Sequence, residues 1–327
     1  MEGQTYIISV FALSLGGSVA CLPLLIYGAK RNNLLDIPNF RSSHTQQVPR
    51  IGGVVFFLAL MSSLFVARKE FDPGGLTAIG MGAMILFAVG LYDDLKFVKP
   101  MVKLLAQLIA LFGLVYFYQD AIERFRIHSL FSGLSSGIFQ VLVYGFFLVL
   151  INAINLMDGI DGLAVLISIN FFAVMTFFFY PSYNGHFSII SMVLIGSMIA
   201  FLFFNLSNRY KVFMGDCGSL LLGFLMCGFS LQLMDSSCCD PALQQFSGNE
   251  LVLLFVALFS LPVSDLFRVI FVRLVKRKPI FGADRNHLHH LVLDKLNGRP
   301  HIYTAMLLFV IHLILILLAL FVMKCAL

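Results

Sequence analysis

The sequence contains no tryptophan and few charged residues, and both absences narrow the class of protein. Only 12% of its 327 residues are charged, against roughly 25% in soluble domains, while 59% are hydrophobic. This composition excludes a water-soluble core of this size. No hydrophilic stretch is long enough for a second domain, so we expect residues 1–327 to form a single integral membrane domain. Any aromatic belt at the membrane interface must consist of tyrosine.

The cysteines give no sign of a disulfide framework. There are six, none forms a CxxC pair, and Cys238 and Cys239 are adjacent in the chain. Adjacent cysteines cannot easily bridge each other, and most of the others lie in or beside apolar runs. We therefore expect them to act as small buried hydrophobic side chains.

Apolar runs of about twenty residues fill most of the chain, which is the length that spans a bilayer as a helix. They cover residues 5–28, 51–67, 77–91, 101–118, 134–152, 161–180, 187–204, 217–234, 250–272 and 303–323. None alternates as a barrel strand would, so helices must satisfy the backbone. The first run is too long for the core of a signal peptide, so we expect an uncleaved helix. The predicted fold is an all-α polytopic bundle of about ten transmembrane helices.

The Lys and Arg residues are distributed unequally between alternate loops. Of the 22, 17 lie in or beside the loops that follow the odd-numbered runs. The positive-inside rule assigns these loops to the cytoplasm and both termini to the outside. Five polar clusters then share the cytoplasmic face, at residues 41–50, 93–94, 152–161, 215–219 and 284–290. On the other side, we expect residues 119–133 to form a short hairpin or an interfacial helix.

Carboxylates gather at the ends of apolar runs, although a charge at a helix centre costs on the order of 2.5–3.5 kcal/mol. Asp93 and Asp94 are adjacent and raise each other's pKa unless Mg²⁺ or nearby lysines offset their repulsion. A solvated loop in which Asp and Lys neutralise each other is the alternative. Glycines flank Asp216 at the start of a run, where backbone N–H groups suit a phosphate and the carboxylate suits its cation. Asp216 as a simple helix cap is the alternative there.

A second acidic cluster has a period of three. Asn152, Asn155, Asp158 and Asp161 would form one polar stripe at the end of a helix if that segment is helical. Hydrogen bonding between helices is the alternative to a ligand site.

Basic and histidine residues complete the pattern. His287 and His290 would share one face of a helix, which zinc could use, but no third ligand stands out and the neighbouring basic residues favour phosphate. Lys103 places a charge just inside a helix, for which snorkelling is the alternative. Asp265 and Arg268, three residues apart in an apolar run, are expected to pair with each other.

Taken together, acidic metal ligands and basic phosphate donors on one membrane face match Mg²⁺-dependent chemistry on a diphosphate, with a second substrate held in the membrane. A secondary transporter of an anionic solute is the alternative from another class. Transporters, however, usually place such residues near the midplane and often show two related halves, and no repeat is visible here.

The motifs resemble those of the polyprenyl-phosphate N-acetylhexosamine-1-phosphate transferases, which are glycosyltransferase family 4-type membrane enzymes. The matching pieces occur in family order between residues 41 and 290. They are Arg41-Ser-Ser-His44 with Pro49-Arg50-x-Gly52-Gly53, Asp93-Asp94, Asn152-x-x-Asn155-x-x-Asp158-Gly-Ile-Asp161-Gly, Gly215-Asp216-Cys217-Gly218-Ser219 and Arg285-Asn-His287-Leu-His289-His290. The last motif is similar to the branch that transfers simple N-acetylated hexosamine phosphates. The phospho-N-acetylmuramoyl-pentapeptide branch, which has a run of adjacent histidines, is the alternative.

The resemblance implies transfer of N-acetylhexosamine-1-phosphate from a UDP-sugar to undecaprenyl phosphate, with release of UMP, at the start of a lipid-linked polysaccharide such as O-antigen. It implies Mg²⁺ as the cofactor, with Mn²⁺ as a candidate substitute. UDP-N-acetylhexosamine, undecaprenyl phosphate and membrane lipids are the expected partners; no nucleic acid is expected, and a homodimer is left open. The expected location is the bacterial inner membrane, with a cytoplasmic active site.

The resemblance also implies roles for particular residues. The expected catalytic residues are Asp93, Asp94, Asp158, Asp161 and His290. The expected substrate-binding residues are His44, Arg50, Lys103, Asn152, Asn155, Arg268, Arg285, His287 and His289. Asp216, with Asp93 and Asp94, is expected to hold the metal.

Overall fold

The structure is a computed structural model that describes residues 2–32, 34–36, 47–67, 73–180, 185–241, 243–276, 291–292 and 301–325. His44, Arg285, His287, His289 and His290 lie outside the described residues.

Every apolar run predicted from the sequence is a helix. The long helices are α1 (Glu2–Arg31), α2 (Gly53–Ala67), α3 (Pro73–Leu95), α4 (Pro100–Phe117), α6 (Ser136–Met157), α7 (Leu163–Phe179), α8 (His186–Asn205), α9 (Gly215–Cys239), α10 (Gly248–Val275) and α12 (His301–Cys325).

Two smaller features connect the bundle. Residues 119–133 contain the short helix α5 (Gln119–Ile127), which agrees with the predicted helix rather than a hairpin. Its position at the membrane interface stays a prediction. Strands β1 (Leu35–Asp36) and β2 (Val48–Pro49) pair antiparallel, with Leu35 opposite Pro49.

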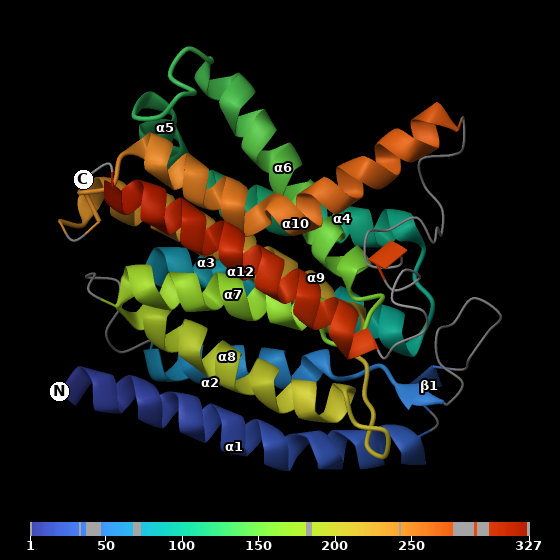
Figure 1. Cartoon of the computed structure of the whole chain (residues 1–327). Helices are drawn as coiled ribbons and strands as arrows, with labels where there is room; N and C mark the ends of the chain where they lie inside the picture. Colours follow the sequence, from blue (N-terminus) through green and yellow to red (C-terminus); the bar gives the residue numbers. More distant parts are fainter. Residues whose placement is uncertain are drawn as a thin grey trace.

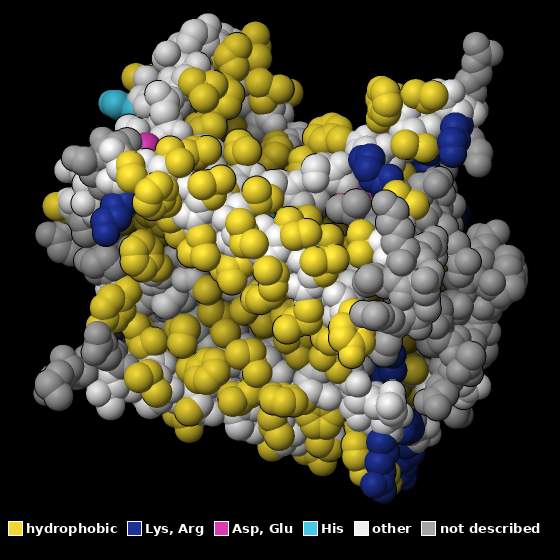
Figure 2. All heavy atoms as spheres, in the orientation of Figure 1, with side chains coloured by type: hydrophobic (Ala, Val, Ile, Leu, Met, Phe, Trp, Pro, Cys, Tyr) yellow, Lys and Arg dark blue, Asp and Glu magenta, His cyan; other side chains and the backbone are white. Residues whose placement is uncertain are grey.

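The helices have the length and composition of a membrane domain. In the described part of the chain, eight are long and apolar enough to cross a bilayer, and α2 and α7 contain shorter apolar helices. Figure 2 shows hydrophobic side chains over the middle of one face and Lys and Arg toward its ends. Both termini lie at the same end of the bundle, whereas β1 lies at the other (Figure 1). The predicted all-α polytopic membrane fold is therefore confirmed.

Helix α9 forms the centre of the bundle. Its apolar stretch is buried throughout, and α3, α6, α5, α2 and α7 pack around it. The contact with α3 is close because Gly90 has no side chain: a Cβ at this position would lie 2.6 Å from the N and Cα atoms of Cys217. This contact fixes the end of α3 against the first turn of α9, which is where the polar clusters meet.

We expect Gly90→Ala to destabilise the protein by at least about 1–3 kcal/mol, because the added methyl group meets rigid backbone of α9. Gly113→Ala, inside α4, is the matched control, since a Cβ there meets nothing within 4 Å. The control should be neutral or more stable by up to about 1 kcal/mol, because alanine favours a helix over glycine. Thermal unfolding of the two purified variants in detergent measures both effects, and equal melting temperatures would contradict the close contact.

Candidate functional site

The candidate site lies where the end of α3, the start of α4, the end of α6 and the start of α9 meet. Asp93 and Asp94 are in the last turn of α3. After four connecting residues, α4 begins with Pro100, a favoured first residue because its missing N–H would be unpaired there anyway. This short connection brings Lys103, one turn into α4, back toward Asp93.

Lys103 bridges two carboxylates from different helices. Its Nζ atom is 3.0 Å from Oδ2 of Asp93 and 2.7 Å from Oδ2 of Asp216. The backbone N–H of Val98 donates to the other oxygen of Asp93 at 2.7 Å, which holds that side chain in place. All three charged side chains are only partly exposed to solvent, so their attraction is stronger than that of a surface pair. The structure thus gives Lys103 two specific carboxylate partners, Asp93 and Asp216, which snorkelling alone would not require.

Asp94 caps helix α9. Its two carboxylate oxygens accept hydrogen bonds from the N–H groups of Asp216 and Cys217, each at 2.9 Å. A carboxylate at this position also complements the positive end of the helix dipole. The sequence suggested that these N–H groups bind a phosphate, but two of them already bond Asp94. Asp94 therefore aligns the first turn of α9, and its role as a metal ligand stays a prediction.

The turn before α9 is built against residues 49–53. The N–H groups of Gly52 and Gly53 donate to the carbonyls of Phe213 and Met214, both at 2.8 Å. Gly215 then adopts a φ of +75°, a left-handed conformation that favours glycine, and a Cβ there would collide with the Asp94 carboxylate. These constraints explain why glycine precedes Asp216.

The predicted polar stripe is helical over only half its length. Asn152 and Asn155 lie in the last turns of α6, but the helix ends at Met157, so Asp158 and Asp161 lie in the loop before α7. The Nδ2 atom of Asn155 donates to the Ser219 hydroxyl on α9 at 2.7 Å. The Nδ2 atom of Asn152 donates at 2.7 Å to Oε1 of Gln107 on α4. Both amides therefore join helices, as the alternative interpretation expected, and their contact with substrate stays a prediction.

Asp158 and Asp161 have different electrostatic surroundings. Burial raises the pKa of Asp158 well above its usual range, the nearby Asp216 carboxylate adds to the rise, and Arg50 opposes it. Burial would also raise the pKa of Asp161, but hydrogen bonds from His301 and Lys211 outweigh burial and hold that pKa below its usual range. Asp161 is therefore ionised at neutral pH, and Asp158 is the carboxyl more readily protonated.

Two residues near the site were missed by the sequence interpretation. Lys211 pairs with Asp161 at 2.7 Å, and Nδ1 of His301, the first residue of α12, is 3.4 Å from the same Oδ2 atom. Residues 161, 211 and 301 belong to no common motif, so their spacing gave no signal.

Arg268, in contrast, forms the predicted pair with Asp265 on α10 at 3.2 Å. The role of Arg268 in substrate binding remains a prediction.

The donor atoms of the candidate site fit a hard cation that is bound together with substrate. Asp93 and Asp216, which share Lys103, supply carboxylate oxygens, the ligands that Mg²⁺ prefers. Within the described ranges, no group of three or more His, Cys, Asp or Glu side chains could hold a metal by itself. Mg²⁺ usually binds through one or two carboxylates and the phosphates of a substrate rather than in a closed protein cage. The arrangement therefore suits a metal that arrives with a diphosphate.

Fold and site together define a polytopic membrane protein with a lysine and carboxylate centre at one end of its helix bundle. The sequence profile of glycosyl transferase family 4 matches residues 76–234, which include that centre. The match and the names of the relatives bear out the predicted resemblance to the polyprenyl-phosphate N-acetylhexosamine-1-phosphate transferases.

Several named relatives are similar over most of their length. A probable undecaprenyl-phosphate N-acetylglucosaminyl 1-phosphate transferase of Bacillus subtilis is 27% identical over 300 residues, 89% of this chain and 78% of the relative. An undecaprenyl-phosphate alpha-N-acetylglucosaminyl 1-phosphate transferase of Yersinia pestis is 29% identical over 271 residues, 80% and 69% of the two chains. A decaprenyl-phosphate N-acetylglucosaminephosphotransferase of Mycobacterium leprae is 28% identical over 320 residues, 88% and 75%.

Proposed function

We propose that this protein transfers N-acetylhexosamine-1-phosphate from a UDP-sugar to a polyprenyl phosphate and releases UMP. The observation that carries the proposal is the Lys103 bridge between Asp93 and Asp216 at one end of a membrane bundle. It combines a cation for phosphate oxygens with carboxylates for a metal, within reach of a lipid head group. The names of the relatives support a lipid phosphate acceptor and an N-acetylglucosamine phosphate donor.

In the proposed reaction, an oxygen of the lipid phosphate attacks the β-phosphorus of the UDP-sugar. The bond from that phosphorus to the bridging oxygen breaks, and the electron pair leaves with UMP. The second pKa of a phosphate monoester is about 6, so the lipid phosphate is largely a dianion at neutral pH and needs no base. The protein's task is to position the two substrates and to neutralise charge. Direct attack is therefore favoured over a covalent aspartyl intermediate.

Individual residues would contribute to this charge balance. Lys103 would contact phosphate oxygens, and Asp216 would be the first ligand of Mg²⁺, with Asp93 beside it. Bound there, Mg²⁺ would neutralise the diphosphate and stabilise the leaving UMP. Asp94 would hold the first turn of α9 in place, and Asp161 would keep Lys211 and His301 at the edge of the site.

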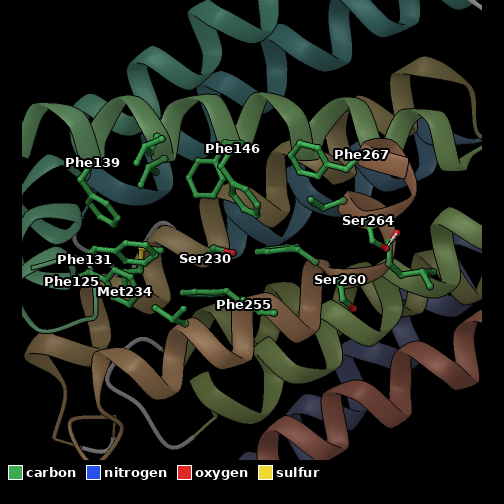
Figure 3. A pocket seen from close by; sticks show the side chains of 18 of the residues that line it. Phe125, Phe131, Phe139, Phe146, Ser230, Met234, Phe255, Ser260, Ser264 and Phe267 are labelled. Carbon is green, nitrogen blue, oxygen red and sulfur yellow. Dashed lines mark hydrogen bonds between the residues drawn. The ribbon is translucent and has the colours of Figure 1, made fainter. Parts of the chain in front are cut away.

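The lipid tail is proposed to occupy a cavity between α6, α9 and α10, which we call the acceptor groove. It has a volume of about 680 Å³ and is lined mainly by apolar side chains. Figure 3 shows aromatic rings directed into it from opposite walls. Its lining includes Phe139, Phe146, Met234, Phe255 and Phe267. Such a surface suits a polyprenyl chain, whose phosphate would then lie at the site end of the bundle in the inner leaflet of a bacterial cytoplasmic membrane.

A panel of UDP-sugars tests the donor. Purified protein with polyprenyl phosphate and Mg²⁺ should convert UDP-N-acetylglucosamine or a related UDP-N-acetylhexosamine into a lipid diphosphate sugar, identified by mass, and should release UMP. UDP-MurNAc-pentapeptide as the sole donor accepted would contradict the simple N-acetylhexosamine class. Incorporation of labelled UMP into UDP-sugar without any lipid acceptor would contradict direct attack and favour the aspartyl intermediate.

A further inference from the structure

Helix α10 contains Pro262 in its interior, and the helix changes direction along its length (Figure 1). Proline has no backbone N–H, and its ring clashes with the carbonyl four residues earlier. The carbonyl of Leu258 therefore loses its partner within the helix. An unpaired carbonyl is costly inside a membrane, because no water is available to bond it. The bend of α10 thus requires a hydrogen-bond donor from another element.

That donor is His312 of α12. Its side chain is fully buried, and Nε2 lies 2.9 Å from the carbonyl oxygen of Leu258. Because a carbonyl only accepts hydrogen bonds, Nε2 must carry the ring hydrogen, which leaves Nδ1 of the neutral ring as an acceptor. The side chain of Asn170 on α7 is also buried, and its Nδ2 atom donates to Nδ1 of His312 at 3.3 Å. A hydrogen-bond chain therefore joins α7, α12 and α10 beside the proline.

The same stretch of α10 forms one wall of the acceptor groove. Ser260 and Ser264, on either side of Pro262, line the groove, and both are labelled in Figure 3. Their hydroxyls bond the carbonyls of Ala257 and Leu261 at 2.8 and 3.2 Å, a local pattern that favours bending. Phe255 lies before the bend and Phe267 after it, so the bend sets how these two rings face the groove.

We propose that His312 and Asn170 are positioning residues that fix the bend of α10 and, through it, the shape of the acceptor groove. They act through the Leu258 carbonyl that Pro262 leaves without a helical donor. The identity of the groove's occupant as a polyprenyl chain rests on the proposed function, whereas the control of the bend does not. The experiment therefore has one arm that needs no catalysis.

The first arm measures the bend with spin labels at Asn249 and Phe271, two exposed positions near the two ends of α10, after replacement of the native cysteines. A straight helix would place these residues about 33 Å apart. His312→Leu should broaden the distance distribution, because the Leu258 carbonyl loses its donor. Pro262→Ala should shift it toward the straight value. The double variant should match Pro262→Ala alone, because the backbone N–H of the introduced alanine replaces His312 as the donor.

Ser168→Ala is the matched control, since this buried hydroxyl on α7 bonds the Ala164 carbonyl of its own helix at 2.8 Å. It should leave the distance distribution unchanged. His312→Gln, whose side-chain amide can still donate to Leu258, should restore part of the wild-type distribution. A wild-type distribution in His312→Leu would overturn the proposal. The proposal would also be overturned if His312→Leu changed the distance distribution equally in the presence and absence of the Pro262→Ala substitution.

The second arm measures transfer. His312→Leu should raise the KM for polyprenyl phosphate roughly tenfold, the size expected for one lost buried hydrogen bond, and leave the KM for UDP-sugar unchanged. An equal rise in both KM values would overturn the link to the groove. If the wild type itself transfers nothing, the proposed function fails, and the spin-label arm alone then decides the role of His312.

Discussion

Asp216→Asn is expected to lower the rate of sugar-phosphate transfer by roughly a thousandfold or more while leaving the protein folded. The substitution removes the charge that pairs with Lys103 at 2.7 Å and the first-choice ligand for Mg²⁺. Asparagine has nearly the same shape as aspartate, and Asp94 still caps α9, so the helix should persist. UMP release at saturating Mg²⁺ gives the rate, and thermal unfolding reports the fold.

The matched control for this variant is Asp235→Asn. Asp235 also lies on α9 and also pairs with a cation, Arg124, at 2.5 Å, but it is near the far end of the helix. Loss of the Asp235 charge should leave turnover within about twofold of wild type, because this ion pair lies at the opposite end of α9 from Lys103 and Asp216. Near-normal turnover of Asp216→Asn at saturating Mg²⁺ would count against Asp216 as the metal ligand.

Lys103→Met should lower turnover by about 10²–10³-fold, the loss typical when a preorganised group that stabilises transition-state charge is removed. Without the ammonium group, the carboxylates of Asp93 and Asp216 would repel each other. The variant should therefore also be less stable than wild type at neutral pH. Adding Asp93→Asn removes one of the repelling charges, so the double variant should regain stability but not activity.

Lys96→Met is the control for the lysine substitution, because Lys96 lies on the same connection between α3 and α4 but is exposed. Its turnover should stay close to wild type. Turnover of Lys103→Met within about twofold of wild type would show that Lys103 only snorkels. The bridging geometry would be contradicted if the double variant Lys103→Met, Asp93→Asn were no more stable than Lys103→Met alone.

The helices could be predicted from the sequence because the membrane leaves few alternatives. An apolar run of this length must satisfy its backbone internally, so each of the ten runs became a helix with ends shifted by a few residues. The polar stripe shows where this reasoning stops. Its period of three continues past Met157, but the helix does not, and Gly162, with a left-handed φ of +79°, allows the chain to turn into α7.

The sequence predicted which residues form the site but not which of them contact each other. Asp93, Lys103 and Asp216 were expected on one face, and the structure brings them into contact. The sequence could not show that Asp94 caps α9 or that Lys211 bonds Asp161, because both contacts depend on how separate helices pack. Local pairs were easier: Asp265 and Arg268 are three residues apart on one helix, and their predicted pairing is confirmed.

The central claim is that the whole sugar phosphate moves from nucleotide to lipid at the Lys103 centre. The most direct test follows UDP-N-acetylglucosamine labelled with ³²P at the β-phosphate, incubated with the purified protein, polyprenyl phosphate and Mg²⁺. We predict that the label enters the lipid fraction and that the released nucleotide is unlabelled UMP. Label retained in released UDP would mean that only the sugar is transferred, and label retained in intact UDP-sugar would mean no transfer; either result would contradict the account.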